Sequence, residues 1–288
     1  SSIPGPDQEN PLAVGHDLIR LRGDDVAVTG VEFDAAGTQL DNNAIQADRC
    51  DGVFVAGNRT VNGFQMGISF TRCRNVVIRG NEVLGPNWYG ITSRGAPAGS
   101  EFDLQPSSDV VIARNRVADV KFNNVATYRV SHFAVLGNLV SDGGHSLVAC
   151  SPAQQGTIVG NVCRDLDPFL PDPGGEAGIE IEYKETHAPE RSSDVTISGN
   201  QVENCPVGVV ARTVPAEAGN AAARAEKRPY SFGVTGNSID CCEQAGIRIR
   251  SGDSAVVATN ALRANGVGID VDEAYTEGLE VGLNAVRE

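Results

Sequence analysis

The sequence predicts an all-β protein, built as one parallel β-helix domain of about ten coils over residues 1–288. Three observations predict this fold. Short β-rich runs that end in asparagine recur along the chain, their commonest spacing is 23 residues, and the composition combines 33 glycines with only 5% aromatic residues. Such a composition suits many short strands joined by tight turns better than it suits a helical bundle.

The repeated runs, such as "VVIRGN", "FAVLGN" and "VTISGN", place an asparagine at the same position of each coil. These asparagines are Asn58, Asn81, Asn115, Asn138, Asn161, Asn200, Asn237, Asn260 and Asn284. A period of 23 residues is too short for a propeller blade or a helical pair, and the L-x-x-L-x-L pattern of a leucine-rich repeat is missing. A side-chain amide at a turn can bond to its copies in the neighbouring coils, and asparagine tolerates the left-handed conformation, so we expect an asparagine ladder. "VAVTGV" at 26–31 looks like an earlier copy with Val31 in the asparagine position.

A second strand is predicted shortly after each asparagine, from runs such as "GISF", "GITS", "GIEI" and "GIRI". Alternation directs their isoleucine and valine side chains inward and the residues between them outward. The steps longer than 23 residues carry most of their surplus just after this strand, at 93–109, 182–194 and 212–231. Loops that protrude on one side of a solenoid usually line its binding face, so we expect a site on this second sheet.

These repeats resemble the right-handed parallel β-helix superfamily, which includes the pectate-lyase-like and polygalacturonase-like enzymes. The resemblance covers nearly the whole chain at the level of the fold, and it implies a right-handed, single-stranded helix. Residues 1–20 would then form an N-terminal extension or a cap. The fold implies no single activity, because such helices also serve as tailspikes and adhesins.

The formal net charge is −14 at pH 7, and the chain has no basic run. A nucleic-acid partner is therefore not expected, because nothing would neutralise the phosphates. No apolar run approaches the roughly 20 residues that a membrane helix needs, so no membrane partner is expected either. A long sheet face with repeated polar positions suits a polysaccharide partner, and a homo-oligomer is compatible with the fold.

Glu180 and Glu182 share the outward face of the predicted strand in "GIEIEYK". Aligning the coils places small residues one coil before this pair and arginines one and two coils after it. This arrangement predicts a groove for a chain-like polar ligand. The residues expected around the groove are Tyr128, Arg129, Glu180, Glu182, Arg212, Arg248 and Arg250.

A Glu-x-Glu pair with a lysine and an arginine nearby is similar to the calcium-assisted alginate and chondroitin lyases of this superfamily. That resemblance implies that Glu180 and Glu182 bind Ca²⁺ through their carboxylate oxygens. It also implies that Lys184 is the base and that Arg212 is the acid or a clamp. The sequence departs from the family pattern in two ways: Lys184 lies closer to the pair, and the preceding coil offers no asparagine ligand.

Two alternatives stay open for the glutamates. Residues i and i+2 of a strand lie about 6.5–7 Å apart at Cα, which is compatible with the roughly 6.5–9.5 Å between the carboxyl groups of inverting glycosidases. "GGHS" and "GIRIRS" are faintly similar to polygalacturonase signatures, but the companion aspartate motifs are absent. The pair could instead form salt bridges with Arg212 and Arg248 across coils, each worth about 0.2–1 kcal/mol of sheet stability.

Aromatic and histidine side chains add further candidates. His145 could act as a general base. Tyr128 could donate a proton, stack on a sugar ring or simply pack. Trp88 and Tyr89, in "GPNWYG", could form a sugar platform at the edge of the groove.

The seven cysteines include two pairs at equal positions in neighbouring coils, Cys50 with Cys73 and Cys205 with Cys242. Stacked coils lie about 4.8 Å apart, which falls within the roughly 4.4–6.8 Å Cα separation of a disulfide. Each pair is either a disulfide or a stack of thiols in the wall. Disulfides would indicate an exported protein, and we expect an extracellular or cell-surface location.

The favoured hypothesis is a carbohydrate-active enzyme that cleaves a uronate-containing polysaccharide by β-elimination. Hydrolysis or transfer on a neutral glycan is the second hypothesis, and a non-catalytic adhesin, tailspike or surface module is the third. The net charge of −14 opposes a polyanionic substrate unless salt screens the charge or a cation bridges it. Calcium is the one cofactor that the sequence leads us to expect.

Overall fold

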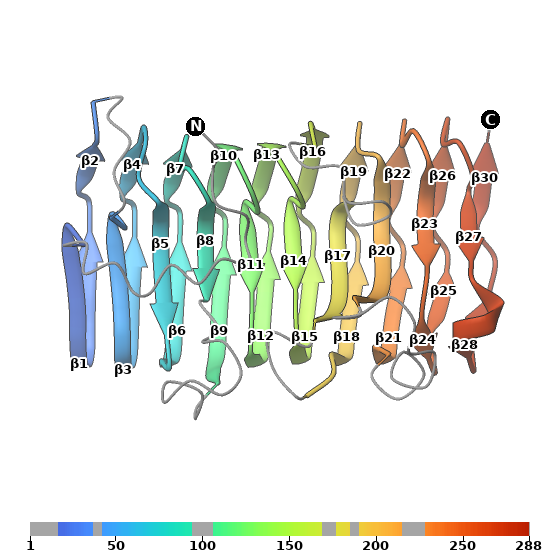
Figure 1. Ribbon diagram of the computed structural model, residues 1–288, viewed down its shortest axis with the longest axis horizontal. Coiled ribbons are helices and arrows are strands. Elements are labelled where there is room, and N and C mark those ends of the chain that lie inside the picture. Colours follow the sequence, from blue (N-terminus) through green and yellow to red (C-terminus); the bar gives the residue numbers. More distant parts are fainter. Residues whose placement is uncertain are drawn as a thin grey trace.

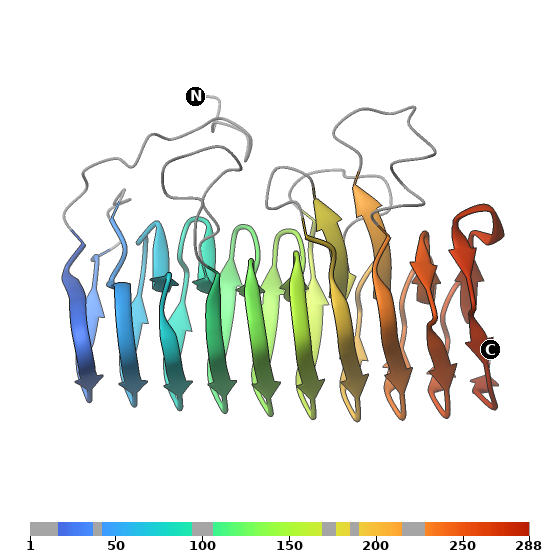
Figure 2. The same ribbon diagram turned by 90° about the horizontal axis from the view of Figure 1, so that it is seen from below.

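The structure, a computed structural model, describes residues 17–36, 42–93, 106–168, 177–184, 190–214 and 228–287. Within these residues nearly all regular secondary structure is β-strand, with one short 3-10 helix, η1 (Glu273–Tyr275). The coils stand side by side in chain order along the long axis (Figure 1), and the view turned by 90° shows their strands in separate layers (Figure 2). The predicted parallel β-helix is therefore confirmed.

Each coil has three strand positions, defined by the ladder asparagine. The strands before the asparagine are β1 (Ile19–Thr29), β3 (Ile45–Ala56), β6 (Arg74–Arg79), β9 (Ser107–Ala113), β12 (Val130–Leu136), β15 (Ala153–Val159), β18 (Ser193–Ser198), β21 (Tyr230–Thr235), β25 (Val256–Ala258) and β29 (Glu280–Val281). The strands directly after it are β2 (Glu32–Asp34), β4 (Arg59–Val61), β7 (Glu82–Leu84), β10 (Arg116–Val120), β13 (Leu139–Gly143), β16 (Val162–Leu166), β19 (Gln201–Glu203), β22 (Ser238–Asp240), β26 (Ala261–Arg263) and β30 (Ala285–Arg287). The third position holds β5 (Met66–Thr71), β8 (Tyr89–Ser93), β11 (Val125–Thr127), β14 (Val148–Cys150), β17 (Ala177–Lys184), β20 (Val207–Val214), β23 (Ala245–Ile249) and β27 (Ile269–Val271), followed in the last coils by the short β24 (Gly252–Asp253) and β28 (Thr276–Glu277).

Neighbouring coils pair in parallel, as β12 does with both β9 and β15. Among the described residues, the strands directly after the asparagine form a ten-stranded sheet, which matches the predicted number of coils. The sequence predicted only two strands per coil and missed this set. Its members are only three to five residues long, so they are too short to show a clear alternation of apolar and polar residues.

The core is a set of aliphatic columns that run along the inside of the helix. One column joins the strands before the asparagine, rung by rung in register. Its members are Ile78, Ile112, Val135, Ile158, Ile197, Val234 and Val257, all 0% exposed. Burying such a side chain contributes roughly 1.5–3 kcal/mol, so the column supplies much of the driving force for stacking.

The predicted asparagine ladder is present from Asn58 to Asn284. At a typical rung, Asn138 donates from its backbone N–H and its Nδ2 to Oδ1 of Asn161, each at 2.9 Å. The same Nδ2 also donates to the carbonyl of Ile112 in the opposite direction, at 2.9 Å. Every amide group of the rung is therefore satisfied although the residue is only 1% exposed.

The left-handed turn lies one residue before the asparagine and not on the asparagine itself, which corrects the expectation from the sequence. Gly137 and Gly160 have φ values of 57° and 66°, and Arg114 takes the same conformation at 54°. A Cβ added to Gly137 would meet nothing within 4 Å. Glycine is therefore favoured here by its backbone freedom rather than by lack of space.

The first coil departs from the ladder as expected. Val31 occupies the asparagine position, and its N–H donates to Oδ1 of Asn58 at 3.0 Å. β1 begins at Ile19, so most of the predicted extension or cap over residues 1–20 lies outside the described residues. No helix in the described part of the chain is long and apolar enough to cross a bilayer.

All seven cysteines fall within the described residues, and all are free thiols. The pairs Cys50–Cys73 and Cys205–Cys242 stack as expected, because their flanking residues are in register across neighbouring coils. Burial raises the pKa of Cys73 to about 11 and that of Cys242 to about 12. Stacked, protonated thiols are thus the form that the structure shows.

The ladder predicts that replacing an interior asparagine destabilises the protein more than replacing the last one. Asn138→Ala leaves the backbone N–H and Nδ2 of Asn115 without their acceptor, which should lower the free energy of unfolding by roughly 2–5 kcal/mol. Asn284→Ala is the matched control, because this last rung is partly exposed and water can replace its bonds. Urea unfolding of both variants checks this, and equal losses would contradict it.

Thiol titration tests the state of the cysteines. In the folded protein at neutral pH, a thiol reagent should modify the exposed Cys241 quickly and the buried thiols slowly, because a thiol with a pKa near 11 or 12 stays protonated until the pH approaches that value. In denaturant without reductant all seven should react. A count of three, that is seven minus four, would show that both stacked pairs are disulfides.

Candidate functional site

Glu180 and Glu182 alternate along β17 with Ile179 and Ile181, which belong to the hydrophobic core. The two glutamates therefore lie on the outer side of the sheet, as predicted. They are not solvated, however, because Glu180 is 0% and Glu182 5% exposed. The pair is therefore enclosed by other side chains rather than exposed on the surface of the predicted groove, and buried carboxylates need partners that replace water.

Arg212, on the neighbouring strand β20, supplies that partner. Its Nε lies 2.6 Å from Oε1 of Glu180, and an Nη lies 3.4 Å from Oε2 of Glu182. The register brings the three together, since Glu182 pairs with Arg212 across the strands. This confirms the predicted inter-coil contact with Arg212. The contact predicted with Arg248 is wrong.

Arg248 instead lies 2.9 Å from Asp270 and donates to the side chain of Gln244 at 2.8 Å. Arg250 lies 3.5 Å from the same aspartate and is 43% exposed at its side chain. Both arginines stay on the predicted face, one coil further from the glutamates than Arg212. Their charges are thus partly neutralised by Asp270.

The positive charge beside the glutamate pair comes from a side chain, and the expected calcium site stays a prediction. Ca²⁺ takes six to eight oxygen ligands, whereas the described residues contain no group of three or more histidine, cysteine, aspartate or glutamate side chains able to hold a metal. The guanidinium of Arg212 already provides the positive charge between the two carboxylates.

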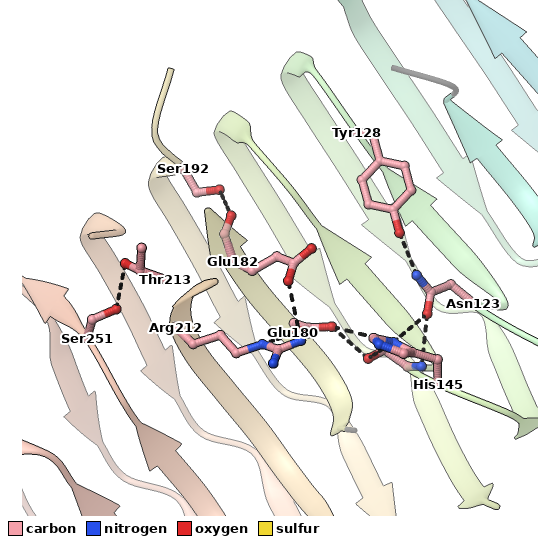
Figure 3. A network of polar contacts seen from close by, with 10 residues as sticks. Asn123, Tyr128, His145, Glu180, Glu182, Ser192, Arg212, Thr213 and Ser251 are labelled. Atoms are coloured by element: carbon pink, nitrogen blue, oxygen red, sulfur yellow. Dashed lines mark hydrogen bonds and ion pairs between the residues drawn. The ribbon is translucent and has the colours of Figure 1, made fainter. Parts of the chain in front are cut away.

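A chain of hydrogen bonds continues from Glu180 across the preceding coils (Figure 3). The hydroxyl of Ser146 donates to Oε2 of Glu180 at 2.7 Å and lies 3.2 Å from Nδ1 of His145. Nδ1 of His145 lies 3.1 Å from Oδ1 of Asn123, and Nδ2 of Asn123 donates to the hydroxyl of Tyr128 at 2.5 Å. His145 and Tyr128, both predicted, are thus joined to the glutamate pair by two residues that were not.

Small residues make room for this network on the outer face. Ala126 and Ala149 occupy the same row as Glu180 in the two preceding coils. Asn123 and Tyr128 flank β11 on either side, and their side chains meet across it. The small residues that the sequence suggested as a groove floor are therefore covered: Ala126 is 0% exposed and Ala149 1%.

The network fixes the tautomer of His145. Oδ1 of Asn123 accepts the backbone N–H of Ser146 at 2.9 Å, which sets the orientation of the amide, because a backbone nitrogen can only donate. Nδ1 of His145 faces this oxygen and must carry the proton in order to bond to it. Nε2 of the neutral ring is then the nitrogen with the lone pair, as a general base requires.

Tyr128 is held in its protonated form. Burial is the main cause that raises the pKa of its hydroxyl well above the usual range, and the nearby Tyr89, Glu182 and Glu180 add to it. A phenol in this state can donate a hydrogen bond or a proton but cannot act as a base near neutral pH. The predicted role as a proton donor agrees with this environment.

An aromatic group adjoins the network. The rings of Trp88 and Tyr89 lie 5.7 and 5.3 Å from that of Phe122, and Tyr89 lies 5.8 Å from Tyr128, all edge to face. The ring of Phe122 lies 4.5 Å from that of His145. The prediction that Trp88 and Tyr89 sit at the edge of the site is consistent with this placement.

Two other predicted residues are less defined. β17 ends at Lys184, whose side chain lies outside the described residues, so its expected role as a base stays a prediction. Arg129 directly follows Tyr128 and is half-buried. The loop stretches expected to flank the site, at 94–105, 185–189 and 215–227, also lie outside the described residues.

Three residues of the site were missed by the sequence reasoning: Phe122, Asn123 and Ser146. A usable signal was present. Trp88, Phe122 and His145 each follow their ladder asparagine by seven residues, and Asn123 and Ser146 each follow by eight. An alignment of the turns, rather than of the strands alone, would have placed them together.

The ion pairs predict that removing Arg212 lowers the free energy of unfolding much more than removing Arg250. Arg212→Met leaves Glu180 and Glu182 buried without their cation, which should lower the free energy of unfolding by roughly 3–5 kcal/mol. Arg250→Met removes a half-exposed arginine and should change it by less than about 1 kcal/mol. Denaturant unfolding at neutral pH measures both, and a small effect at Arg212 would contradict the described pairing.

No protein-family model and no curated protein sequence matches the chain. Several solved structures are similar to the chain. A surface adhesin of Streptococcus pneumoniae, PfbA, has a TM-score of 0.67 and 16% identity, over 94% of this chain and 71% of that one. An alginate lyase from Paenibacillus sp. str. FPU-7 has a TM-score of 0.61 and 10% identity, over 93% of this chain and 87% of the lyase. A mutant of the periplasmic alginate epimerase AlgG has a TM-score of 0.60 and 13% identity over 83% of this chain, which spans only 51% of the epimerase. At such identities the likeness shows a shared parallel β-helix fold.

Proposed function

We propose that the protein is a polysaccharide lyase that cleaves a uronate-containing polymer by β-elimination, with His145 as the base and Tyr128 as the proton donor. The observation that carries this proposal is the arrangement around Asn123. One side-chain amide holds the Nδ1–H of His145 on its oxygen and the hydroxyl of Tyr128 on its nitrogen. A base and an acid are thus separated by a single amide group, on the outer face of the sheet.

The proposed reaction needs no water and no redox partner. Nε2 of His145 takes the proton from C5 of the uronate, the electron pair forms the C4–C5 double bond, and the bond from C4 to the glycosidic oxygen breaks. The hydroxyl of Tyr128 gives its proton to that oxygen. The proton on His145 then returns to solvent and the tyrosine is reprotonated, so the enzyme is restored. Each proton transfer of this type contributes typically 10²–10⁴-fold to a rate.

Glu180 and Arg212 support this chemistry without contacting the substrate. Glu180 accepts from Ser146, whose hydroxyl lies against the protonated Nδ1 of His145. Arg212 keeps the charge of Glu180 compensated in the buried site. Arg212 is therefore assigned a positioning role here, and we assign the uronate carboxylate to Arg129, the half-buried arginine that follows Tyr128.

The electrostatics of this face are more favourable than the net charge suggests. The strands of the third position and the residues that follow them carry arginines at 129, 212, 248 and 250. The charge of −14 therefore lies largely elsewhere on the molecule. A polyanionic substrate would meet a face that is close to neutral, and the remaining repulsion is screened by salt.

Hydrolysis of a neutral glycan fits less well. An inverting glycosidase needs one carboxylic acid beside the glycosidic oxygen. Both oxygens of Glu180 are taken, one by Arg212 and the other by Ser146, and Glu182 also lies against Arg212. The fold neighbours described as an alginate lyase and an alginate epimerase support a uronate polymer as the substrate class. Neighbours that are periplasmic or on a cell surface support an exported location, which we propose as well.

Turnover on a panel of polymers tests the proposal. Alginate, other uronate polymers and neutral glucans would be incubated at low and high salt, with calcium or with a chelator. Ultraviolet absorbance of unsaturated uronate and the number of reducing ends would be followed together. We expect both signals on a uronate polymer, with no need for calcium.

Variants sharpen this test. His145→Ala and Tyr128→Phe should each lower kcat by about 10²–10⁴-fold. His132→Ala is the matched control, because this histidine on β12 is 59% exposed at its side chain and lies 3.9 Å from Asp109, which is not part of the network. Reducing ends without unsaturation would show a hydrolase instead. If every polymer survives, the enzyme proposal fails and a binding role, like that of the adhesin among the fold neighbours, would replace it.

A further inference from the structure

Three ring-bearing side chains occupy the same turn of three consecutive coils. Phe122 N–H donates to the carbonyl of Trp88, and His145 N–H donates to that of Phe122, both at 3.1 Å. Trp88, Phe122 and His145 are therefore successive rungs of one column, which we call the aromatic column. It runs along the axis of the β-helix and ends at the proposed catalytic base.

Phe122 and Tyr128 are buried, each 7% exposed, but they lie apart from the main core cluster. None of Trp88, Tyr89, Phe122 and Tyr128 belongs to the core cluster of buried residues. The core of these coils is filled instead by aliphatic side chains such as Ile91 and Val125, which are 0% exposed. The rings at this turn therefore form a separate packed group beside the aliphatic core.

Two of the rings, those of Trp88 and Tyr89, keep surface available for a ligand, whereas Phe122 is only 7% exposed. Trp88 and Tyr89 are half-buried, and Phe122 lies between them and His145. In an edge-to-face pair, only one of the two rings has a face covered by its neighbour. The interplanar angles of 64° at Trp88 and 86° at Tyr89 are of this type.

A pyranose ring has the complementary chemistry. Its axial C–H groups form an apolar face with a slight positive charge, which suits the negative face of an aromatic ring. A polymer laid along the axis would rest on the exposed parts of Trp88 and Tyr89, which Phe122 supports from below, and deliver its next sugar to His145. The opposite side of the site is different, because Arg248, Arg250 and Asp270 offer charges rather than rings.

We infer that the aromatic column is a carbohydrate subsite that binds sugar rings of the polymer on the N-terminal side of His145. This inference rests on the proposed function for its substrate class, a uronate polymer. One arm of the substrate is held by aromatic surface and the other by charged groups. Binding at the aromatic column should therefore depend weakly on salt, whereas the charged side should weaken as salt rises.

The single tryptophan of the chain makes the aromatic column directly observable. Trp88 is the only tryptophan in the sequence, so its fluorescence reports on this subsite alone. We would titrate the Tyr128→Phe variant, which keeps its ring but should not turn over, with alginate oligosaccharides of defined length. A saturable change in tryptophan emission is expected, with an apparent Kd that changes little with salt for oligosaccharides short enough to occupy the aromatic column alone.

A second variant tests whether the ring of Phe122 contributes to binding. Phe122→Leu, made in the Tyr128→Phe background, removes the central ring but keeps an apolar side chain, and should weaken binding by roughly three- to tenfold. Phe54→Leu is the matched control: Phe54 lies on β3 beneath Arg79, away from the aromatic column. That variant should leave the affinity unchanged.

The outcomes separate this inference from the proposed function. An emission change that Phe122→Leu weakens supports the subsite even if the unmodified protein shows no turnover, in which case only the lyase proposal fails. Calorimetric binding without any change in tryptophan emission, and with full affinity in Phe122→Leu, would overturn the subsite while leaving turnover intact. Absence of binding to every oligosaccharide would overturn it as well.

Discussion

The asparagine ladder is the interaction on which the rest of the structure depends. Each rung holds two neighbouring coils in one register through bonds to the next side chain and to the backbone behind it. Because strands in a parallel sheet can slip, a buried amide that is satisfied in only one register selects that register. The columns of the core and the rows of the outer face follow from it.

Register turns a linear repeat into a functional surface. Residues separated by 22 to 39 positions in the chain become neighbours, as His145 does with Asn123 and Asn200 with Asn161. The site uses this directly, since its contacts from Asn123 to His145, from Ser146 to Glu180 and from Glu180 to Arg212 each join one coil to the next. A chain-like ligand that lies along the axis would meet the same geometry repeated from coil to coil, which is why a solenoid suits a polymer.

Burial decides the roles of the charged groups. The opposite charges of Glu180, Glu182 and Arg212 balance one another in a buried group of ion pairs. The hydrogen-bonded chain from Ser146 to Tyr128 connects this group to the aromatic column. Small residues at 126 and 149 leave the space that these larger side chains fill. In the proposed function His145 and Tyr128 carry the proton transfers, while the buried glutamates hold the surrounding side chains in place.

The sequence by itself determined the fold class, the number of coils, the asparagine ladder and the outward direction of Glu180 and Glu182, because a repeat with a constant period places equivalent residues above one another. It also pointed to His145, Tyr128, Trp88 and Arg212 as residues of one face. Only the tertiary structure decided that the glutamates are buried on Arg212 and joined to His145 through Ser146. The physical reason is that alternation tells which way a side chain points, whereas its solvent exposure and its hydrogen-bond partner depend on side chains from neighbouring coils and turns.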